Sequence, residues 1–295
     1  TPRCNLRCPV CFADSGQGTD PDLETLRHTF RLLMKQTGGC NLQLSGGEPT
    51  MRDDLPAVIE AAREAGFAFI QLNTNGIKLA EDPELAGRLK ESGLSSVFLQ
   101  FDSLRDEPLI RLRGKALFAA KCLALDALAK VGIGAVLVPT LVPGINTEEV
   151  WEIVRFAINR LPHVRGVHFQ PISYFGRFPK QFAPQHITLP ELIRLLHEQS
   201  SGILQASDFH PPACEHALCS FSAKYLADEH GSLQRLGSAS CDCSPQPALD
   251  GALKSIAVTA RQWQGIPLNI PMADPQDDFD RFLNRARTHT FTISA

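Results

Sequence analysis

The sequence predicts an α/β protein whose strands form a parallel, barrel-like sheet. Helical periodicity alternates with short apolar runs along most of the 295 residues, which is the pattern of repeated β-α units rather than of separate α and β blocks. Polar residues follow three successive strands at their ends. In open α/β sheets and in barrels the ligand site lies beyond the carboxyl ends of the strands, and the repeated polar ends favour the mouth of a barrel.

Each predicted element has its own signals. Helices are expected where apolar residues recur with helical spacing, at residues 22–35, 54–65, 83–92, 116–130, 147–159 and 189–199. Strands are expected where β-branched or aromatic runs are closed by Gly, Pro or Asn, at residues 41–44, 67–72, 96–101, 133–138 and 164–169. Thr1 lies where a preceding strand would end, so we expect an N-terminally truncated array of six units. Residues 277–295 fit a short polar helix followed by a strand-like end.

The composition excludes several classes of protein. Lys and Arg number 29 and Asp and Glu 32, a net charge of −3, so the chain lacks a basic excess and we expect no nucleic-acid partner. No run of about 18 apolar residues is present, so we expect no transmembrane segment. Nine cysteines without a secretory leader predict a reducing, cytoplasmic compartment.

Paired polar side chains mark the ends of three predicted strands. Because alternate residues of a strand share one face, the members of each pair point the same way: Gln43 with Ser45, Gln71 with Asn73, and Gln100 with Asp102. Ordinary fraying of a strand into solvent explains one such pair. Three pairs at the same height predict a polar, inward-facing mouth.

Three cysteines crowd into the first residues with the spacing Cys4-x₃-Cys8-x₂-Cys11. Three thiolates at this spacing fit a [4Fe–4S] cluster in which one iron has no protein ligand and is open to a substrate or cofactor. The spacing alone also allows a zinc site with a distant fourth ligand, or reduced core cysteines.

With Phe12 directly after Cys11 and Gly46-Gly47-Glu48-Pro49 at the end of the next predicted strand, this motif resembles the radical S-adenosylmethionine (SAM) superfamily. The resemblance implies a partial parallel (β/α)₆ barrel in which SAM binds the open iron through its amino and carboxylate groups. It implies an oxygen-sensitive enzyme in which an electron from a low-potential flavodoxin or ferredoxin cleaves SAM to methionine and a 5′-deoxyadenosyl radical. The radical would take hydrogen from a substrate, for carbon–carbon bond formation or methylation.

The resemblance also assigns roles to residues. Cys4, Cys8 and Cys11 would hold the cluster, and the methionine amino end of SAM would bind at the turn Ser45-Gly46-Gly47-Glu48-Pro49. The ribose, the methionine carboxylate or the substrate would be faced by Asn73, Asn75, Gln100 and Asp102. Two plainer alternatives stay open. The Gly-Gly-Glu-Pro turn could simply lead into a helix capped by Asp53 or Asp54. Residues 73–76 also fit an ordinary turn.

Residues 1–202 resemble one branch of the superfamily more closely, in phrases such as Cys8-Pro9-Val10-Cys11-Phe12-Ala13 and Phe169-Gln170-Pro171-Ile172-Ser173. That branch includes archaeal tetraether lipid synthase, pterin methyltransferase-like enzymes and bacterial radical SAM (seleno)proteins. The phrases lie on the expected cofactor face, so they imply shared SAM chemistry more than a shared substrate, for which we expect a lipid or a small molecule. Members of the branch tend to be longer at the N-terminus.

The β-α rhythm weakens after residue 200, and we expect a radical SAM core at residues 1–205 followed by an irregular extension at 206–295. The extension carries four cysteines, Cys214, Cys219, Cys241 and Cys243, with His210 and His216 nearby. These residues predict an auxiliary iron–sulfur cluster or zinc ion, or a lid of unmetallated thiols over the mouth.

Several other residues have plain structural interpretations. Cys40 and Cys122 fit small, buried apolar side chains. His168 fits a hydrogen-bonded core histidine, although it shares a face with Gln170 and could line the barrel. A solvated basic loop, with anionic-substrate binding as the alternative, is expected at Arg105, Arg111, Arg113 and Lys115.

Two other functions stay open. A non-catalytic zinc or iron–sulfur binding module would hold metal without responding to SAM. An RNA-modifying radical enzyme would need the basic surface that the composition does not supply.

Overall fold

The computed structural model describes residues 1–16, 18–180, 186–211, 218–228, 231–237, 248–266 and 277–295. Its centre is an eight-stranded sheet. In spatial order the strands are β1 (Leu42–Leu44), β2 (Ile70–Thr74), β3 (Ser96–Gln100), β4 (Gly134–Val138), β6 (Val164–His168), β10 (Thr290–Ser294), β8 (Ser222–Ala227) and β9 (Leu233–Leu236). A separate two-stranded sheet of β5 (Thr140–Leu141) and β7 (Gln170–Pro171) continues beyond β4 and β6.

The five predicted strands are confirmed as β1, β2, β3, β4 and β6, and they pair in parallel in chain order. On the outer face Val97 and Leu99 are fully buried against helices. On the inner face Gln43 Nε2 donates to Gln71 Oε1 at 3.0 Å, and Gln71 Nε2 donates to Ser96 Oγ at 3.4 Å. Because β1 and β9 lie at opposite edges of the sheet, the barrel is partial rather than closed.

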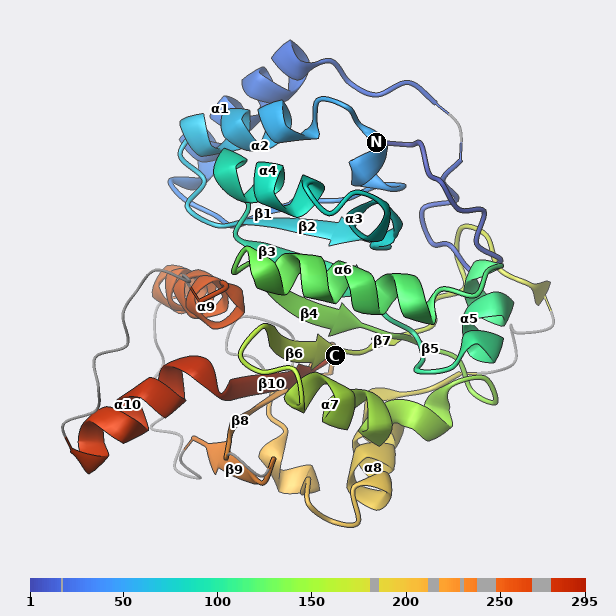
Figure 1. The fold of residues 1–295 in the computed structure, drawn as a ribbon, viewed down its shortest axis with the longest axis vertical. Coiled ribbons are helices and arrows are strands. Elements are labelled where there is room, and N and C mark those ends of the chain that lie inside the picture. Colours follow the sequence, from blue (N-terminus) through green and yellow to red (C-terminus); the bar gives the residue numbers. More distant parts are fainter. Residues whose placement is uncertain (17, 181–185, 212–217, 229–230, 238–247, 267–276) are drawn as a thin grey trace.

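The six predicted helices are also present, with bounds within a few residues of those expected: α1 (Leu23–Thr37), α2 (Leu55–Glu64), α4 (Leu85–Ser92), α6 (Phe118–Lys130), α7 (Val150–Ile158) and α8 (Leu189–Gln199). Asp22 begins α1 by accepting a hydrogen bond from Thr25 N, and Thr188 begins α8 through a reciprocal capping box with Glu191. In Figure 1, β2, β4 and β6 point toward the side where α5 (Asp106–Arg113), β5 and β7 lie.

Several features of the fold, including the two-stranded sheet of β5 and β7, were not predicted. The helix α3 (Ile77–Glu81) precedes α4, and α5 replaces the expected basic loop. The described part of the C-terminal extension also carries regular elements, namely β8, β9, α9 (Ala248–Trp263), α10 (Asp278–Thr288) and β10. Of these, only a short helix and a strand at the very end were expected.

The C-terminal strand β10 completes the row of six parallel strands. It pairs in parallel with β6, with Ser294 opposite His168, and antiparallel with β8. The sheet therefore contains strands from both sides of the boundary predicted at residue 205. The division into a core at residues 1–205 and an extension at 206–295 stays a prediction from the sequence.

Residues before the first cysteine continue the parallel pattern at the β1 edge. Thr1 N donates to Ser45 O at 3.5 Å, and Gly47 N donates to Thr1 O at 2.6 Å. Thr1 thus bonds through its N and its O to the residues on either side of Gly46, which is the hydrogen-bond pattern of parallel strands. The start of the chain is thereby fixed beside the end of β1.

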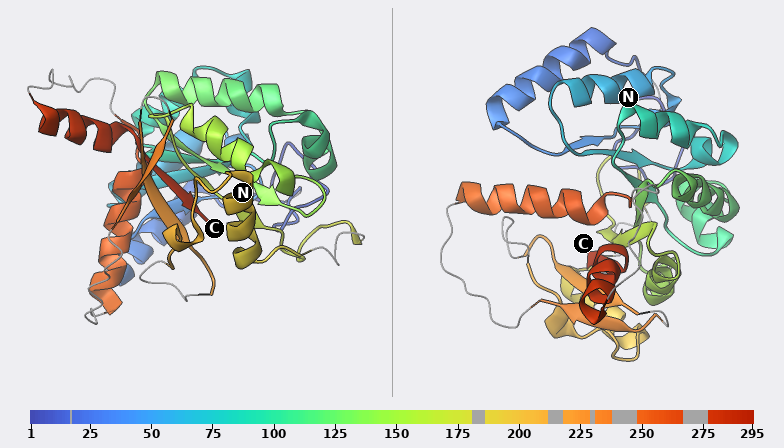
Figure 2. Two further views of the ribbon diagram at one scale, coloured as in Figure 1. Left: turned by 90° about the horizontal axis from the view of Figure 1, so that it is seen from below. Right: turned by 60° about the vertical axis from the view of Figure 1, so that its left-hand side comes forward.

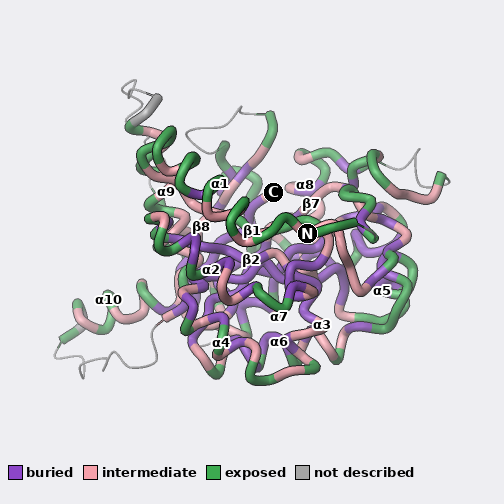
Figure 3. Tube along the Cα trace, turned by 90° about the horizontal axis from the view of Figure 1, so that it is seen from above, coloured by how far each residue is buried: buried purple, intermediate pink, exposed green. Residues whose placement is uncertain are grey.

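A buried arginine joins the amino ends of the strands to the last two helices. Arg165 on β6 donates to the carbonyl oxygens of Gln262 at 3.1 Å, Thr288 at 2.9 Å and Arg287 at 3.1 Å, at the ends of α9 and α10. Burial lowers the pKa of Arg165 to about 10. From this attachment α10 extends away from the sheet (Figure 2), and most of its described residues are exposed or half-buried (Figure 3), whereas β2, β3, β4 and β6 are mostly buried. Within the described residues, no helix combines the length and apolar character needed to cross a membrane.

Candidate active site

A cavity of about 450 Å³ opens at the carboxyl ends of the parallel strands. Ten of the predicted site residues line it: Cys4, Cys8, Cys11, Ser45, Gly46, Gly47, Glu48, Asn73, Asn75 and Gln100. Pro49 and Asp102 lie behind its wall, Pro49 as the first residue of a 3₁₀ turn (Pro49–Met51) and Asp102 with no exposed surface. The structure therefore brings together segments that are up to 96 residues apart in the sequence.

The three N-terminal thiols are free and share one wall of the cavity. They pack with Leu6, Leu109 and other apolar side chains, and burial raises the pKa of Cys4 and of Cys8. Burial acts in the same direction on Cys11, but hydrogen bonds from Ser15 and the Arg177 charge outweigh it and lower the pKa of that thiol. Within the described residues, no three His, Cys, Asp or Glu side chains have the grouping of ligands to one metal ion.

A clamp that the sequence analysis missed holds the cysteine loop from the opposite side. Arg177, after β7, exchanges backbone hydrogen bonds of 2.8 and 2.9 Å with Cys11. Its guanidinium donates to Cys8 O at 2.8 Å, Asp14 Oδ1 at 3.0 Å and Ser15 O at 3.2 Å. Gly176 makes this approach possible, since it has φ +70° and a Cβ there would overlap the carbonyl oxygens of Phe12 and Cys11.

Gly46 and Gly47, which follow β1, allow the backbone of this turn to lie directly against the backbone of Thr1 and Arg3. A Cβ on Gly46 would overlap the Thr1 carbonyl oxygen, and one on Gly47 would overlap that of Arg3. Glu48 N also donates to Arg3 O at 2.8 Å. The turn therefore seats the residues that lead into the first cysteine. Of the two residues that could cap the next helix, Asp54 stands at the N-cap position of α2, but its side chain makes no capping hydrogen bond and its carboxylate pairs with Arg52.

The Glu48 carboxylate is almost completely buried and joins the end of β1 to the end of β2. Its Oε1 accepts hydrogen bonds from Thr50 N at 3.1 Å, Thr50 Oγ1 at 2.7 Å and Thr74 Oγ1 at 2.7 Å. Its Oε2 accepts from Asn75 N at 2.7 Å. At about two acceptor positions on each carboxylate oxygen, the three donors more than fill Oε1, whereas Oε2 has one donor and keeps capacity for one more.

The two asparagines after β2 have different surroundings. Asn75 Nδ2 donates to Asn5 Oδ1 at 2.7 Å and Asn75 Oδ1 accepts from Ile77 N at 3.0 Å, so this side chain ties the cysteine loop to α3. Asn73 Oδ1 is buried in the cavity wall and has no hydrogen-bond partner among the described residues. A buried acceptor without a partner is costly, and a bound ligand would satisfy it.

A buried ion pair joins Arg113, which lines the cavity, to Asp102 behind the wall. Arg113 Nε and Nη2 donate to the two carboxylate oxygens of Asp102 at 2.7 and 2.6 Å, and Nη1 donates to Val10 O at 3.0 Å. Burial opposes ionisation, but the Arg113 charge and its hydrogen bonds lower the pKa of Asp102, and that pair raises the pKa of Arg113. The expected solvated loop is therefore wrong for Arg113, whose partner follows β3 and could not be identified from local sequence.

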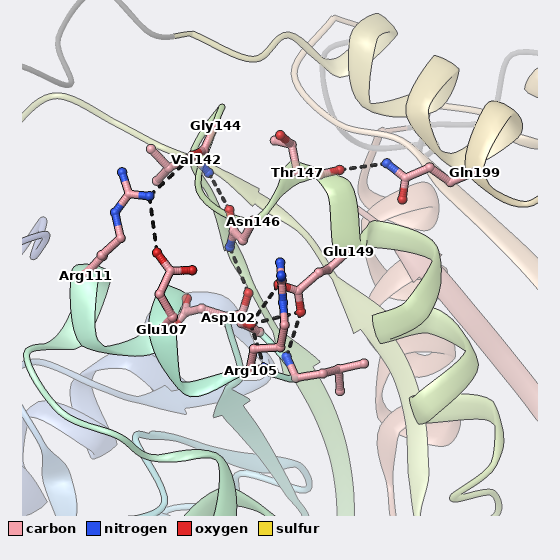
Figure 4. Close-up of polar contacts among 12 residues, drawn as sticks. Asp102, Arg105, Glu107, Arg111, Val142, Gly144, Asn146, Thr147, Glu149 and Gln199 are labelled. Atoms are coloured by element: carbon pink, nitrogen blue, oxygen red, sulfur yellow. Dashed lines mark hydrogen bonds and ion pairs between the residues drawn. The ribbon is translucent and has the colours of Figure 1, made fainter.

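A second buried carboxylate stiffens the loops behind the site (Figure 4). Glu149 accepts from Arg105 Nε and Nη2 at 2.9 and 2.7 Å and from Leu104 N at 3.0 Å. Asn146 Nδ2 donates to the carbonyl oxygens of Asp102 and Thr140, both at 2.8 Å. These contacts fix the segments after β3 and β5 relative to each other.

The far wall of the cavity is aromatic and apolar, with Phe98, Val138, His168 and Phe169. The His168 ring stacks on Phe98 with centroids 5.7 Å apart, and its Nδ1 shares a hydrogen bond of 2.9 Å with Ser294 Oγ of β10. His168 thus lines the barrel, which was the less favoured interpretation of its position.

The predicted auxiliary site is described only in part. Cys219 is an exposed free thiol, whereas Cys214, Cys241, Cys243 and His216 lie outside the described residues. The auxiliary cluster or zinc stays a prediction.

Comparison with known proteins gives the cavity a family context. A sequence profile described as the Radical SAM superfamily matches residues 1–157. A curated 7,8-dihydro-6-hydroxymethylpterin dimethyltransferase of Methanocaldococcus jannaschii is 43% identical over 217 residues, covering 72% of this chain and 43% of the relative. A GTP 3′,8-cyclase of Pelotomaculum thermopropionicum is 32% identical over 179 residues, covering 59% of this chain and 54% of the cyclase. The chain spans about half the length of these relatives.

Solved structures share the fold. SuiB of Streptococcus suis, crystallised with S-adenosylmethionine, matches with a TM-score of 0.53 at 18% identity, over 68% of this chain and 45% of SuiB. Methylornithine synthase (PylB) matches with a TM-score of 0.52 at 15% identity, over 68% of this chain and 60% of that enzyme. At such identities the likeness shows the architecture alone.

Proposed function

This chain belongs to the Radical SAM superfamily of enzymes, whose members use a [4Fe–4S] cluster and SAM, and we propose that it cleaves SAM reductively in the cavity at the carboxyl ends of its strands. The observation that carries the proposal is that three free thiols from one loop and the turn that includes Glu48 line the same cavity. The proposed chemistry is the reductive cleavage of SAM to methionine and a 5′-deoxyadenosyl radical, which takes hydrogen from the substrate.

The residues fit the cofactors. Each cysteine of a cluster binds a different iron, so the site does not require the tighter grouping of ligands to a single metal ion. Cys4, Cys8 and Cys11 would hold three irons and leave the fourth without a protein ligand. The apolar packing behind the thiols would shield a cluster from water.

Two features of the wall fit SAM. Oε2 of Glu48 has capacity for one donor, which suits the ammonium of the methionine part. The unpartnered Asn73 Oδ1 is an acceptor for a ribose hydroxyl. Asn75 and Asp102 would act by holding the cysteine loop and Arg113 in place, because their polar atoms are engaged by protein groups.

We propose a planar ring as the recognised part of the substrate, for carbon–carbon coupling or methyl transfer. The stacked Phe98 and His168 offer an aromatic surface, and the curated relatives are named for a pterin and for GTP. The probes are 7,8-dihydro-6-hydroxymethylpterin, GTP and a lipid extract. Each probe is labelled with deuterium and added separately. Deuterium transfer to 5′-deoxyadenosine from the pterin or GTP alone supports this class, and transfer from lipid alone contradicts it.

An electron donor and a location complete the proposal. One electron must reach the cluster, so we propose a low-potential flavodoxin or ferredoxin as partner. We also propose a cytoplasmic location, because six described cysteines are free thiols and such thiols persist in reducing compartments.

Anaerobic reconstitution with iron and sulfide tests the cofactor site. We expect C4A, C8A and C11A each to lose most of the bound iron, and we expect SAM to alter the electron paramagnetic resonance signal of the reduced wild-type cluster. C40A is the matched control, because Cys40 lies before β1 and outside the cavity. Bound metal with a signal that SAM leaves unchanged would support the alternative of a non-catalytic binding module.

A further inference from the structure

A fully buried lysine lies behind the cavity and was not singled out from the sequence. Lys121 on α6 has no exposed surface, and lysine is almost never fully buried without compensation of its charge. Its Nζ donates to Gln100 O at 2.5 Å and to Asn75 O at 3.2 Å. Both acceptors are backbone carbonyls rather than carboxylates.

The two carbonyls occupy a special place in the sheet. Pairing of β2 with β3 ends with Thr74 opposite Leu99, so Asn75 and Gln100 are the next residues along the two strands. Lys121 therefore bridges the strands where the backbone ladder stops. Both bridged residues line the cavity.

The charged and titratable groups around Lys121 belong to the cavity and its wall. Asp102, Arg113, Cys8 and Glu48 all act on it electrostatically. Burial lowers the pKa of Lys121 to about 8, with the Asp102 charge opposing the shift. The side chain is therefore still mainly an ammonium at neutral pH, and it can donate to both carbonyls at once.

We propose that Lys121 is a positioning residue for SAM, which acts by holding the carbonyls of Asn75 and Gln100 together so that the ends of β2 and β3 keep the spacing that the cavity requires. The inference rests on the proposed function of the cavity. It differs from a general stabilising role because the residues that Lys121 holds line the SAM site itself.

Lys90 provides a matched control. Its Nζ donates to Gly132 O at 3.2 Å in a partly buried position, and burial also lowers its pKa. Neither Lys90 nor Gly132 lines the cavity. K90M thus removes the same kind of bond from the same protein without touching the cavity.

The test measures SAM binding separately from folding and from cluster content. K121M, K90M and wild type are reconstituted anaerobically, matched for iron and sulfide, and dialysed against radiolabelled SAM. We expect K121M to bind SAM about tenfold or more weakly, which is the effect of losing about 1.4 kcal/mol of positioning, with iron content near that of wild type. We expect K90M to bind SAM as wild type does, although its melting temperature also falls.

K121R keeps the positive charge and donors, and we expect its SAM affinity to lie between those of K121M and wild type. If K121M does not fold, a K121R affinity below that of both wild type and K90M, at equal iron content, supports the proposal. Unchanged SAM affinity in K121M, or in K121R when K121M does not fold, would overturn it. So would equal losses in K121M and K90M. A wild-type protein that binds iron but no SAM would instead contradict the proposed function.

Discussion

The Glu48 carboxylate shows how a residue assigned to a ligand can first serve the fold. It accepts four hydrogen bonds from Thr50, Thr74 and Asn75, and these join the turn after β1 to the end of β2. In the Glu48→Gln variant, one oxygen becomes an NH₂ group that faces a donor. We expect a loss of about 1–3 kcal/mol in the free energy of unfolding, measured by urea titration, and weaker SAM binding.

Glu198→Gln is the control for that change. Glu198 pairs with Arg194 on the exposed face of α8, where such pairs contribute about 0.3–0.5 kcal/mol. Equal urea midpoints for the two variants would contradict the role given to the buried carboxylate.

Lys121 gives a pH dependence with a defined sign. Its pKa falls from 10.5 in the unfolded chain to about 8 in the folded protein, chiefly by burial. Between these values the unfolded state binds more protons, so stability rises with pH. We expect the wild type to gain stability relative to K121M between pH 8 and pH 10, by at most about 3 kcal/mol at roughly 1.4 kcal/mol per pKa unit. A difference that is constant across this range in chemical denaturation would contradict burial of a titrating ammonium.

At the scale of elements, Arg165 fastens α9 and α10 to the amino end of β6. In Arg165→Met the terminal carbonyls of both helices lose a charged donor inside the protein. We expect a loss of about 2–4 kcal/mol of unfolding free energy and faster amide hydrogen exchange in α10 and β10. Arg194→Met, which removes an exposed pair, serves as the control, and similar exchange in the two variants would refute the fastening role.

The segment after β7 is the second element with a testable role. We expect Gly176→Ala to loosen the cysteine loop, because an added Cβ would overlap the carbonyls of Phe12 and Cys11 at a left-handed backbone position. The cost should exceed about 1 kcal/mol, with less iron retained after reconstitution. Gly87→Ala in α4 meets no atom within 4 Å and should be neutral or slightly stabilising. A stable G176A protein with full iron content would contradict the clamp.

At the scale of the whole molecule, local periodicity located five strands and six helices of the first 200 residues but missed α3, α5, β5 and β7. The spacing of Cys4, Cys8 and Cys11 located one wall of the cavity. Sequence could not identify the partners made by tertiary packing. The sequence places Arg113 in a basic segment but does not show its pairing with Asp102, and it gives no sign that Lys121 is fully buried. The strand at the end of the chain was expected, but its place between β6 and β8 was not, because that place depends on pairing with residues far away in the chain.

The central claim is that one cavity holds both the cysteine-bound cluster and SAM. It is tested most directly by incubating the reconstituted protein with SAM and a strong reductant under anaerobic conditions and measuring 5′-deoxyadenosine and methionine by mass spectrometry. We predict equal amounts of the two products from wild type and C40A, and none above background from C8A. Equal product from C8A and wild type, or no product from a wild-type protein with full iron content, would contradict the account.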